Sequence, residues 1–574
     1  MKNKEEVFKR IIELCLIILI GRLFYLQILN GDFYNDLAEK NYLKFITLPA
    51  PRGIVYDRNG VSLVKNEIKY SLYLVPPYEK GKNSIKKLSE IIGMEEKKIE
   101  KIFEKVTPFY PAVLLKENLT PKEIVLLEEN RDLLPSFSIN VEFVRSYPFG
   151  DLGAHVLGYM GEVSKEELQD EESNYSLGEK SGKFGIEASY EKVLRGEKGF
   201  RGISLYTKDK KYVFSGQKDP VPGNSLVLSL DIDLQKVVEE ALGDEIGSVI
   251  VSNPWTGEVL AMASHPSFDP NKFISGFSKT EWESFVKDPN NPLNNRAISS
   301  LYAPGSIFKL VVSLAALENR KVSEKDTFFC PGVYRMGKYV FKCWKKDGHG
   351  KINFINGIAN SCNVVFYNVG LRVGEEEIFK FAKKFFLDSK TGIDIPGEVK
   401  GFIPSKKWKE ENLKEPWYPG DTINLSIGQG FVLVTPLEIH SMVSMIATEG
   451  RLYKPHLVKR ILNPTTLEEK DFEPELIGKV DISKKTWEVL KEGMEKVIEE
   501  GTGTAARIPG IKIAGKTGTA ENPHGESHAW FSAFSPAENP QYVVTVFLEH
   551  GKSGGGRAAP IAKKIMEFLL KEGK

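Results

Sequence analysis

The feature that most constrains this sequence is a long apolar segment close to its N-terminus. Residues 11–29 read IIELCLIILIGRLFYLQIL and follow a start rich in lysine and arginine. At about 1.5 Å per residue, a helix of this length spans roughly 29 Å, the thickness of the hydrocarbon core of a bilayer. No small-residue cleavage site follows the segment, so we expect an uncleaved anchor that crosses the cytoplasmic (inner) membrane once, with its basic flank inside. The rest of the chain then lies in the periplasm or at the outer face of the membrane.

Charge and motif content narrow the classes of function. Lys and Arg total 78 residues against 77 for Asp and Glu, so no net field attracts nucleic acid and we expect no such partner. No glycine-rich phosphate-binding motif followed by a helix supports ATP or NAD chemistry.

The apolar segment is interrupted by three polar residues, Glu13, Arg22 and Gln27. These residues leave a buried amphipathic helix as the alternative to a membrane anchor.

The residues that follow the apolar segment are predicted to form an elongated, non-catalytic module. Short β-rich runs alternate here with turns. Residues 84–132 carry apolar residues at helical spacing, and Thr120 with Glu123 fits a capping box, so we expect a helical head insertion. The Gly- and Pro-rich stretch 216–224 marks the end of the module.

The C-terminal part is predicted to be a single α+β domain. A β-hairpin pattern at 247–264 is followed by a long region of helical patterns, and strand patterns return between 510 and 550. Strands at both ends of a region imply a central antiparallel sheet flanked by helices. The predicted parts are a cytoplasmic tail and transmembrane anchor at 1–30, an α+β pedestal or dimerisation-type module at 31–225, and a catalytic domain at 226–574.

The first candidate catalytic motif is Ser306-x-x-Lys309, at the start of the helical pattern SIFKLVVSLAALE. Free backbone N–H groups at a helix N-terminus favour developing negative charge near Ser306. Lys309 lies one turn further on the same face, and its neutral amine can take the serine proton if burial and a second cation lower its pKa. Taken alone, the pattern also fits a serine that only caps a helix.

The second candidate motif is Ser361-Cys362-Asn363, in a polar break between helical patterns. Ser361 is placed to relay a proton to a leaving amine. The amide of Asn363 is placed to contact both Lys309 and a substrate carbonyl. An isolated tripeptide of this kind carries little information by itself.

The third candidate motif is Lys516-Thr517-Gly518-Thr519, at the end of a strand pattern. A strand edge with a cation and two hydroxyls suits a peptide that bears a carboxylate and binds as an extra strand. Gly518 allows close approach of another backbone segment. The N–H groups of Ser306 and Thr519 are candidates for an oxyanion hole.

Three motifs of this type in this order are the set found in penicillin-binding proteins and class A β-lactamases. The chain resembles class B penicillin-binding proteins of the elongation type, known as penicillin-binding protein 2. The resemblance extends over nearly the whole chain, in the stretches RLFYLQILNGDFY, RGIVYDRNG, RSYPFGDLGAHVLGYMGEV, GKFGIEASYEKVLRG, APGSIFK, SCN, SIGQGFVLVTPLE and KTGTAENPHGESHAWFSAFSP. The last stretch favours the elongation type over the division type. Cys362 departs from the pattern, because the lactamase motif has Asp there.

The resemblance implies a D,D-transpeptidase that cross-links peptidoglycan and needs no cofactor for its chemistry. Ser306 would attack the D-Ala–D-Ala carbonyl of a stem peptide, with Lys309 as general base. Ser361 would protonate the departing D-Ala, and an acceptor amine would then resolve the acyl-enzyme. The residues that would hold the peptide and its carboxylate are Asn363, Lys516, Thr517, Gly518 and Thr519. β-Lactams would acylate the same serine.

Three other functions are alternatives to a transpeptidase of this type. A class A β-lactamase requires a Glu four residues before an Asn between the second and third motifs, and residues 363–516 contain no such pair. A non-catalytic penicillin-binding sensor or scaffold would have no need of intact motifs. A bifunctional enzyme would carry a glycosyltransferase, which residues 31–225 do not resemble, so we expect a separate partner. In this family that partner is a SEDS-type glycosyltransferase within the elongation complex.

The cysteines suggest a second kind of site. Cys330, Cys343 and Cys362 enclose His349 within a short stretch, and three thiolates with one imidazole form a closed tetrahedral set for structural zinc. Some elongation-type relatives bind a metal beside the second motif. An oxidising compartment favours the alternative, one disulfide and a free thiol.

Overall fold

The computed structural model describes residues 2–32, 34, 43–75, 82–105, 113–134, 136–170, 175–176, 178–206 and 211–572. Contacts between residues divide the chain into two compact units. The first unit comprises Met1–Arg52, Asn66–Val144 and Arg195–Gly223, and the second comprises Gly53–Lys65, Arg145–Leu194 and Asn224–Lys574. This division places Gly53–Lys65 and Arg145–Leu194 in the same unit as the C-terminal part. Because the units are not continuous in sequence, they do not define a single border, and the predicted domains 31–225 and 226–574 remain predictions.

The N-terminal apolar segment is helical and unburied. It forms α1 (Lys2–Phe24), which continues into a short π-helix, η1 (Tyr25–Leu29). The span Glu6–Leu29 is long and apolar enough to cross a membrane, and none of its most apolar window is buried. A core helix would be covered by the rest of the protein, so this observation favours an anchor over a buried amphipathic helix.

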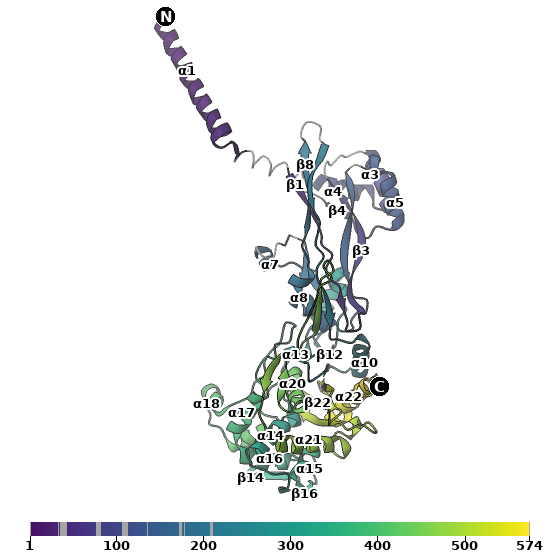
Figure 1. Cartoon of the computed structure of the whole chain (residues 1–574), viewed down its shortest axis with the longest axis vertical. Helices are drawn as coiled ribbons and strands as arrows, with labels where there is room; N and C mark the ends of the chain where they lie inside the picture. The colour runs from purple at the N-terminus through teal and green to yellow at the C-terminus, as the bar shows by residue number, and fades with distance from the viewer. Residues whose placement is uncertain are drawn as a thin grey trace. The chain divides into compact units, whose positions relative to one another are not determined.

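The first unit contains two sheet segments and a helical head (Figure 1). One antiparallel sheet has the order β1-β8-β9, and β4 and β5 pair with β3. In the head, Leu88, Ile99 and Leu127 share a small core. The capping box of Thr120 and Glu123 is present at the start of α5. The elements here are β1 (Leu43–Leu48), β3 (Ser62–Leu74), α3 (Lys82–Ile92), α4 (Glu96–Lys105), β4 (Val113–Lys116), α5 (Pro121–Glu129), η2 (Arg131–Leu133), β5 (Phe137–Ser146), β8 (Gly199–Tyr206) and β9 (Lys211–Lys218).

One expectation for the head was incomplete. The stretch 84–132 was predicted to be helical, and it contains the strand β4 between α4 and α5. The run VLLK is too short for apolar periodicity to separate a strand from a helix. Residues 106–112 of this stretch lie outside the described residues.

The second unit is built around a five-stranded antiparallel sheet. Its strand order is β12-β11-β23-β22-β21, so strands from the two ends of the catalytic region pair as predicted. The strands are β11 (Gly247–Ser252), β12 (Val259–His265), β21 (Ala514–Ala520), β22 (His528–Ser535) and β23 (Tyr542–Leu548). β21 forms one edge of this sheet, where it pairs only with β22 among the described strands.

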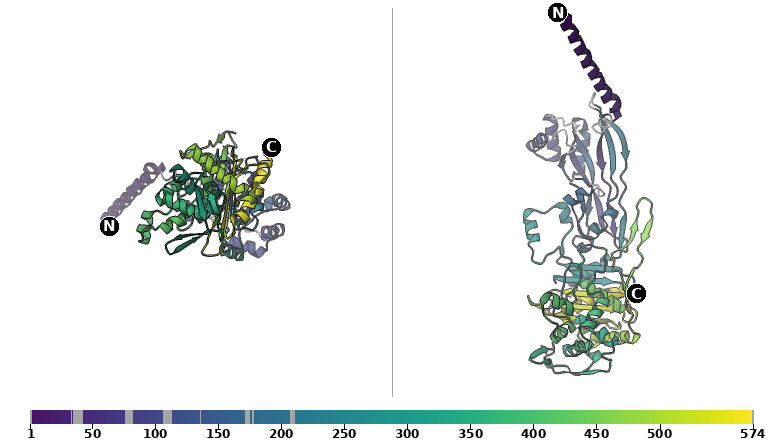
Figure 2. Two further views of the ribbon diagram at one scale, coloured as in Figure 1. Left: turned by 90° about the horizontal axis from the view of Figure 1, so that it is seen from below. Right: turned by 90° about the vertical axis from the view of Figure 1, so that its left-hand side faces the viewer.

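Helices cover both faces of the sheet (Figure 2). α10 (Ile232–Leu242) and α22 (Ala559–Glu572) pack together against one face, and α20 (Pro436–Ala447) packs against β22 and β23 on the other. A helical group adjoins this second face. It consists of η3 (Gly305–Phe308), α14 (Lys309–Glu318), α15 (Phe354–Ala359), α16 (Asn363–Val373), α17 (Glu375–Lys384), α18 (Lys406–Leu413), α19 (Pro419–Ser426) and α21 (Lys484–Glu499).

Short elements complete the second unit. β10 joins β2 in parallel and β18 in antiparallel pairing, which ties three distant stretches together. The remaining elements are β2 (Val55–Tyr56), α6 (Ala154–Leu157), β6 (Met160–Glu162), α7 (Lys165–Gln169), β7 (Lys180–Gly182), α8 (Gly185–Ser189), α9 (Glu191–Leu194), β10 (Ser225–Leu228), α11 (Asn271–Ser275), α12 (Lys279–Val286), α13 (Arg296–Ser299), β13 (Thr327–Cys330), β14 (Val333–Met336), β15 (Tyr339–Lys342), β16 (Gly350–Asn353), β17 (Arg451–Tyr453), β18 (Val458–Leu462), β19 (Glu469–Asp471), β20 (Leu476–Lys479), η4 (Thr504–Ala506) and η5 (Gly554–Ala558).

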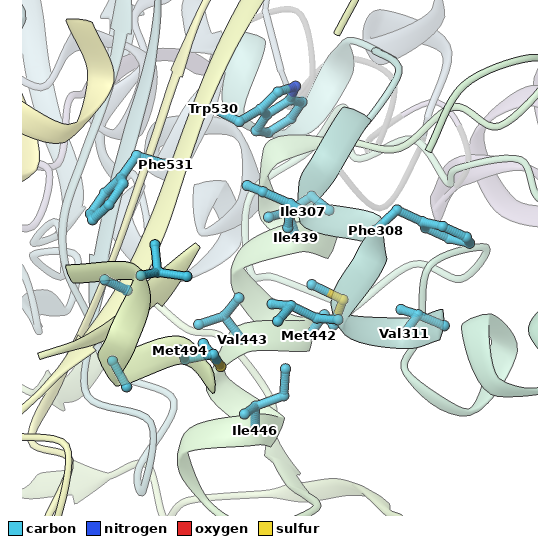
Figure 3. Close-up of a cluster of buried hydrophobic side chains, with 14 of the residues drawn as sticks. Ile307, Phe308, Val311, Ile439, Met442, Val443, Ile446, Met494, Trp530 and Phe531 are labelled. Atoms are coloured by element: carbon cyan, nitrogen blue, oxygen red, sulfur yellow. The ribbon is translucent and has the colours of Figure 1, made fainter. Parts of the chain in front are cut away.

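A continuous apolar core lies behind the first candidate motif. Figure 3 shows Ile307 and Phe308 beside side chains of α20, including Ile439 and Met442, and beside Trp530 of β22. All five are fully buried. Burial of this much apolar surface fixes the turn that carries Ser306 against the sheet.

Candidate active site

Ser306 lies in a tight turn of the main chain. It belongs to η3, and α14 begins only at Lys309. Gly305 has a φ of 53°, and a Cβ there would lie 2.6 Å from the carbonyl oxygen of Thr519. Glycine is therefore required for η3 to approach β21 closely. No side-chain capping bond forms at this helix start, so the alternative in which the serine only caps a helix is not supported.

Lys309 is fully buried and hydrogen-bonded to the second motif. Its Nζ donates to the backbone oxygen of Ser361 at 2.8 Å, to Ser361 Oγ at 3.2 Å and to Asn363 Oδ1 at 2.8 Å. Burial lowers the pKa of Lys309 to about 7. Among the described ion pairs none involves this amine, so the neutral form needed by a general base is accessible near neutral pH.

Ser361 is held in an unusual conformation between α15 and α16. Its φ is 49°, in the left-handed region that residues with a side chain rarely adopt. Asn363, the first residue of α16, also donates from Nδ2 to the backbone oxygen of Lys342 at 3.2 Å. Hydrogen bonds from Lys309 and the start of α16 two residues later hold Ser361 in place. Strained backbone conformations of this kind are common at functional sites.

Lys516 completes the network from β21. It is fully buried, and its Nζ donates to Ser361 Oγ at 3.0 Å and to the backbone oxygen of Thr517 at 2.9 Å. Burial, and then the charge of Lys309, lower the pKa of Lys516. Ser361 Oγ accepts from both lysines, so both of its lone pairs are used and its own proton is free to be donated elsewhere.

The third motif presents side chains from the edge strand β21. A Cβ at Gly518 would lie 2.9 Å from Trp530 Cβ and 3.1 Å from the backbone oxygen of Pro304, so a larger residue would push η3 and β21 apart. Thr517 Oγ1 lies 2.6 Å from Thr502 Oγ1. Residues 510–517 also match the spacing of a phosphate-binding P-loop. Their end lies within a strand, not a loop before a helix, which excludes that assignment.

These residues open onto one cleft of about 960 Å³. Ser306, Ser361, Asn363, Thr517 and Thr519 line it. Lys309 and Lys516 lie behind this lining and are fully buried. The structure therefore brings together all three sequence motifs, although they are more than 200 residues apart at the extremes.

Sequence reasoning missed part of the cleft wall. The described lining also includes residues of the β14–β15 hairpin and its end, of α16, and of the loop after α21. These are Val340, Phe341, Lys342, Trp344, Tyr367 and Thr502. No local pattern marks them, because their position depends on long-range packing. Gln429 and Gly430, from the stretch SIGQGFVLVTPLE, also line the cleft.

The cysteines and His349 form a compact cluster directly beside Ser361. The Sγ atoms of Cys330 and Cys343 lie 3.6 and 3.7 Å from His349 Nδ1. One ligand atom from each of these residues and from Cys362 lies within 4.8 Å of all the others. Zn–S and Zn–N bonds of about 2.0–2.3 Å place tetrahedral ligands about 3.5–3.8 Å apart, so the donor set and its spacing fit zinc. None of the four described cysteines forms a disulfide.

Comparisons with known proteins agree with this geometry. The family model described as Penicillin binding protein transpeptidase domain matches residues 247–567, and the one described as Penicillin-binding Protein dimerisation domain matches residues 47–228. The chain is 34% identical to the peptidoglycan D,D-transpeptidase MrdA of Haemophilus influenzae, over 97% of this chain and 89% of that relative.

Solved structures resemble the chain over a similar extent. A penicillin-binding protein (PBP2) solved in complex with MreC from Helicobacter pylori is 31% identical, with a TM-score of 0.79 over 92% of this chain and 99% of that one. A chain from a structure on coordination of polymerization and crosslinking by a peptidoglycan synthase complex is also 31% identical. Its TM-score is 0.74, over 98% of this chain and 97% of that one.

Proposed function

The chain belongs to the class B penicillin-binding proteins, in the elongation-type penicillin-binding protein 2 group, and from this premise we propose the roles of its individual residues. The enzyme is a serine D,D-transpeptidase that cross-links peptidoglycan stem peptides during cell elongation. Full-length similarity to MrdA favours this function over a division-type enzyme or a non-catalytic scaffold. The observation that carries the assignment of residues is the network that joins Lys309 and Lys516 through Ser361.

The first half of the reaction is acylation of Ser306. Lys309, with a pKa lowered to about 7, takes the hydroxyl proton as Oγ attacks the carbonyl between the two D-Ala residues. The N–H groups of Ser306 and Thr519 stabilise the oxyanion. Ser361 then gives its proton to the departing amine of D-Ala, and Lys309 or Lys516 restores that proton. The C–N bond breaks and an ester to Ser306 remains.

The second half transfers the acyl group to an amine of a neighbouring stem peptide. The amine attacks the ester carbonyl, its proton passes to the same relay, and Ser306 leaves with a proton regained from Lys309. Thr517, Thr519 and Asn363 line the cleft and would hold the peptide during both halves. A β-lactam would enter the first half as a mimic of D-Ala–D-Ala and stop as a stable ester.

The direct test is labelling of the full-length protein with penicillin. We expect a long-lived adduct on Ser306, located by peptide mass spectrometry and absent in Ser306→Ala. Rapid turnover of the adduct would instead support a β-lactamase. Failure of penicillin to label the wild-type protein, with or without a polymerase partner, would overturn the assignment.

We propose that the second unit functions outside the cytoplasm, with α1 and η1 as a single membrane anchor. Its partners would be a SEDS-type glycosyltransferase and other elongation-complex proteins, and residues 31–225 would contact them. Solved relatives in complexes with MreC and in a peptidoglycan synthase support such partners. Cross-linking mass spectrometry of the full chain with a SEDS partner should place the cross-links in 31–225. Cross-links confined to 226–574 would contradict this.

We further propose that Cys330, Cys343, His349 and Cys362 hold a structural zinc ion. When bound, the ion would neutralise the buried thiolates and fix the loop that begins α16. Elemental analysis of the full-length protein should give close to one equivalent of zinc, and Cys330→Ser should lower both the zinc content and the thermal midpoint. Less than a tenth of an equivalent in wild-type protein would overturn the site.

A further inference from the structure

Glu521 is the one carboxylate among the described residues that line the cleft. It is exposed, and no hydrogen bond or ion pair to it occurs among the described contacts. Lys342 is the other charged residue of the lining, and the two are not paired with each other. An exposed carboxylate in the cleft lining, without a partner among the described contacts, is suited to bind a cationic group of a ligand.

Strand geometry places Glu521 in line with the third motif. Side chains two residues apart on a strand share a face and are separated by about 6.6 Å. Thr517, Thr519 and Glu521 follow this spacing, and all three line the cleft. β21 ends at Ala520 and is the edge of its sheet. The carboxylate therefore continues the face along which an added peptide strand would run.

Tyr367 of α16 lines the same cleft as Glu521. The hydroxyl of Tyr367 on α16 donates to the backbone oxygen of Lys342 at 2.9 Å. Glu521, one residue beyond the end of β21, thus shares the cleft with a residue of a separate element.

The register of a bound peptide identifies the group that Glu521 meets. Under the proposed function, the C-terminal carboxylate of the donor lies at Lys516 and Thr517, and its reacting carbonyl lies between Ser306 and Thr519. The peptide then runs antiparallel to β21, and its next residue toward the N-terminus lies beside Glu521. We propose that Glu521 binds the side-chain ammonium of the residue that precedes D-Ala–D-Ala. The preferred donor is a stem peptide with a diamino acid at that position and a free amine.

The test compares two donors that differ only in this charge. The full-length protein is given Nα-acetyl-Lys-D-Ala-D-Ala or its Nε-acetylated analogue, and D-Ala release is measured. Each rate is divided by the rate of penicillin acylation of Ser306. We expect kcat/KM to favour the free amine by about threefold to tenfold, mainly through KM. Glu521→Gln should abolish the preference, whereas Glu526→Gln, an exposed carboxylate outside the cleft lining, should retain it.

The outcomes separate this inference from the proposed function on which it rests. If penicillin acylates Ser306 but wild-type protein does not distinguish the two donors, the inference fails and the transpeptidase assignment stands. If Glu521→Gln keeps the donor preference and slows only transfer to an amine acceptor, the carboxylate serves the acceptor and the donor assignment is overturned. If penicillin does not acylate Ser306, the proposed function itself fails.

Discussion

Two buried networks in the second unit each contain a serine hydroxyl that is hydrogen-bonded to a titratable side chain. In the sheet core, Ser252 Oγ lies 2.6 Å from His440 Nε2, and Thr545 Oγ1 lies 3.0 Å from His440 Nδ1. Beside the cleft, Ser361 Oγ lies 3.2 Å from the amine of Lys309 and 3.0 Å from that of Lys516. The core network has the shorter contact between serine and base, yet only the second network reaches a described cleft.

The two networks differ in access to a cleft and not in the length of their hydrogen bonds, and on access we base the proposal that only the second one takes part in a reaction. Burial lowers the pKa of His440 to about 3, so it is neutral at any physiological pH. Burial lowers the pKa of Lys309 to about 7, where its proton can be exchanged during a reaction. The His440 network satisfies polar groups within a packed core, whereas the Lys309 network adjoins the cleft, where the proposed mechanism needs a proton carrier.

The largest effect is expected from removal of the cleft base. Lys309→Met should lower the rate of penicillin acylation by about 10²- to 10⁴-fold, because general-base catalysis contributes this much. The matched control is Lys512→Met, which removes an exposed lysine that pairs with Glu538. Penicillin should acylate this variant at the wild-type rate. Stopped-flow or gel-based acylation kinetics measure both variants. A loss of less than tenfold in a folded Lys309→Met protein would contradict the role of general base.

The second-largest effect on the acylation rate is expected from a change of pH. Lys309 acts as a base only when neutral, so the rate should rise about tenfold per pH unit below pH 7 and level off above it. The neutral His440 of the core network should add no inflection between pH 5.5 and 9. The measurement is the second-order acylation rate across that range. A flat profile would mean that another group accepts the serine proton.

Sequence patterns predicted the core of the site, because its residues occur as short motifs at strand and helix ends. The S-x-x-K, S-x-N and K-T-G residues meet as expected, and the strands of the central sheet lie where alternation placed them. The roles of individual residues remain predictions. The cleft wall at Val340, Trp344 and Tyr367 was not foreseen, because tertiary packing brings those residues from separate elements.

The core network was equally invisible in the sequence. Ser252 and His440 are separated by 188 residues, and neither lies in a recognisable motif. A histidine on an apolar helix such as α20 carries no signal of its partners. The left-handed conformation of Ser361 was also unpredictable, since nothing in its local sequence marks it and its hydrogen-bond partners Lys309 and Lys516 come from other elements.

Removal of the core histidine should affect stability and leave the chemistry intact. His440→Leu leaves the hydroxyls of Ser252 and Thr545 without this partner, and we expect a loss of about 2–4 kcal/mol in the free energy of unfolding. Thermal unfolding of the full-length protein, followed by loss of penicillin binding, measures the change. The acylation rate of protein that remains folded should equal that of the wild type. A large fall in this rate would mean that the two networks are coupled.

The smallest effect is expected from the loss of a single hydrogen bond at the edge of the core network. Ser532 Oγ lies 2.7 Å from Thr545 Oγ1, so Ser532→Ala removes one hydrogen bond while Thr545 keeps its contact with His440. We expect a loss of about 1 kcal/mol in the free energy of unfolding and no change in acylation. Ser535→Ala on the same strand is the matched control, because the buried Ser535 Oγ has no hydrogen-bond partner among the described residues. That variant should be neutral or slightly stabilising, since it removes a polar atom that pays a desolvation cost without a bond. Equal losses from the two variants would show that the contact between Ser532 and Thr545 contributes nothing of its own.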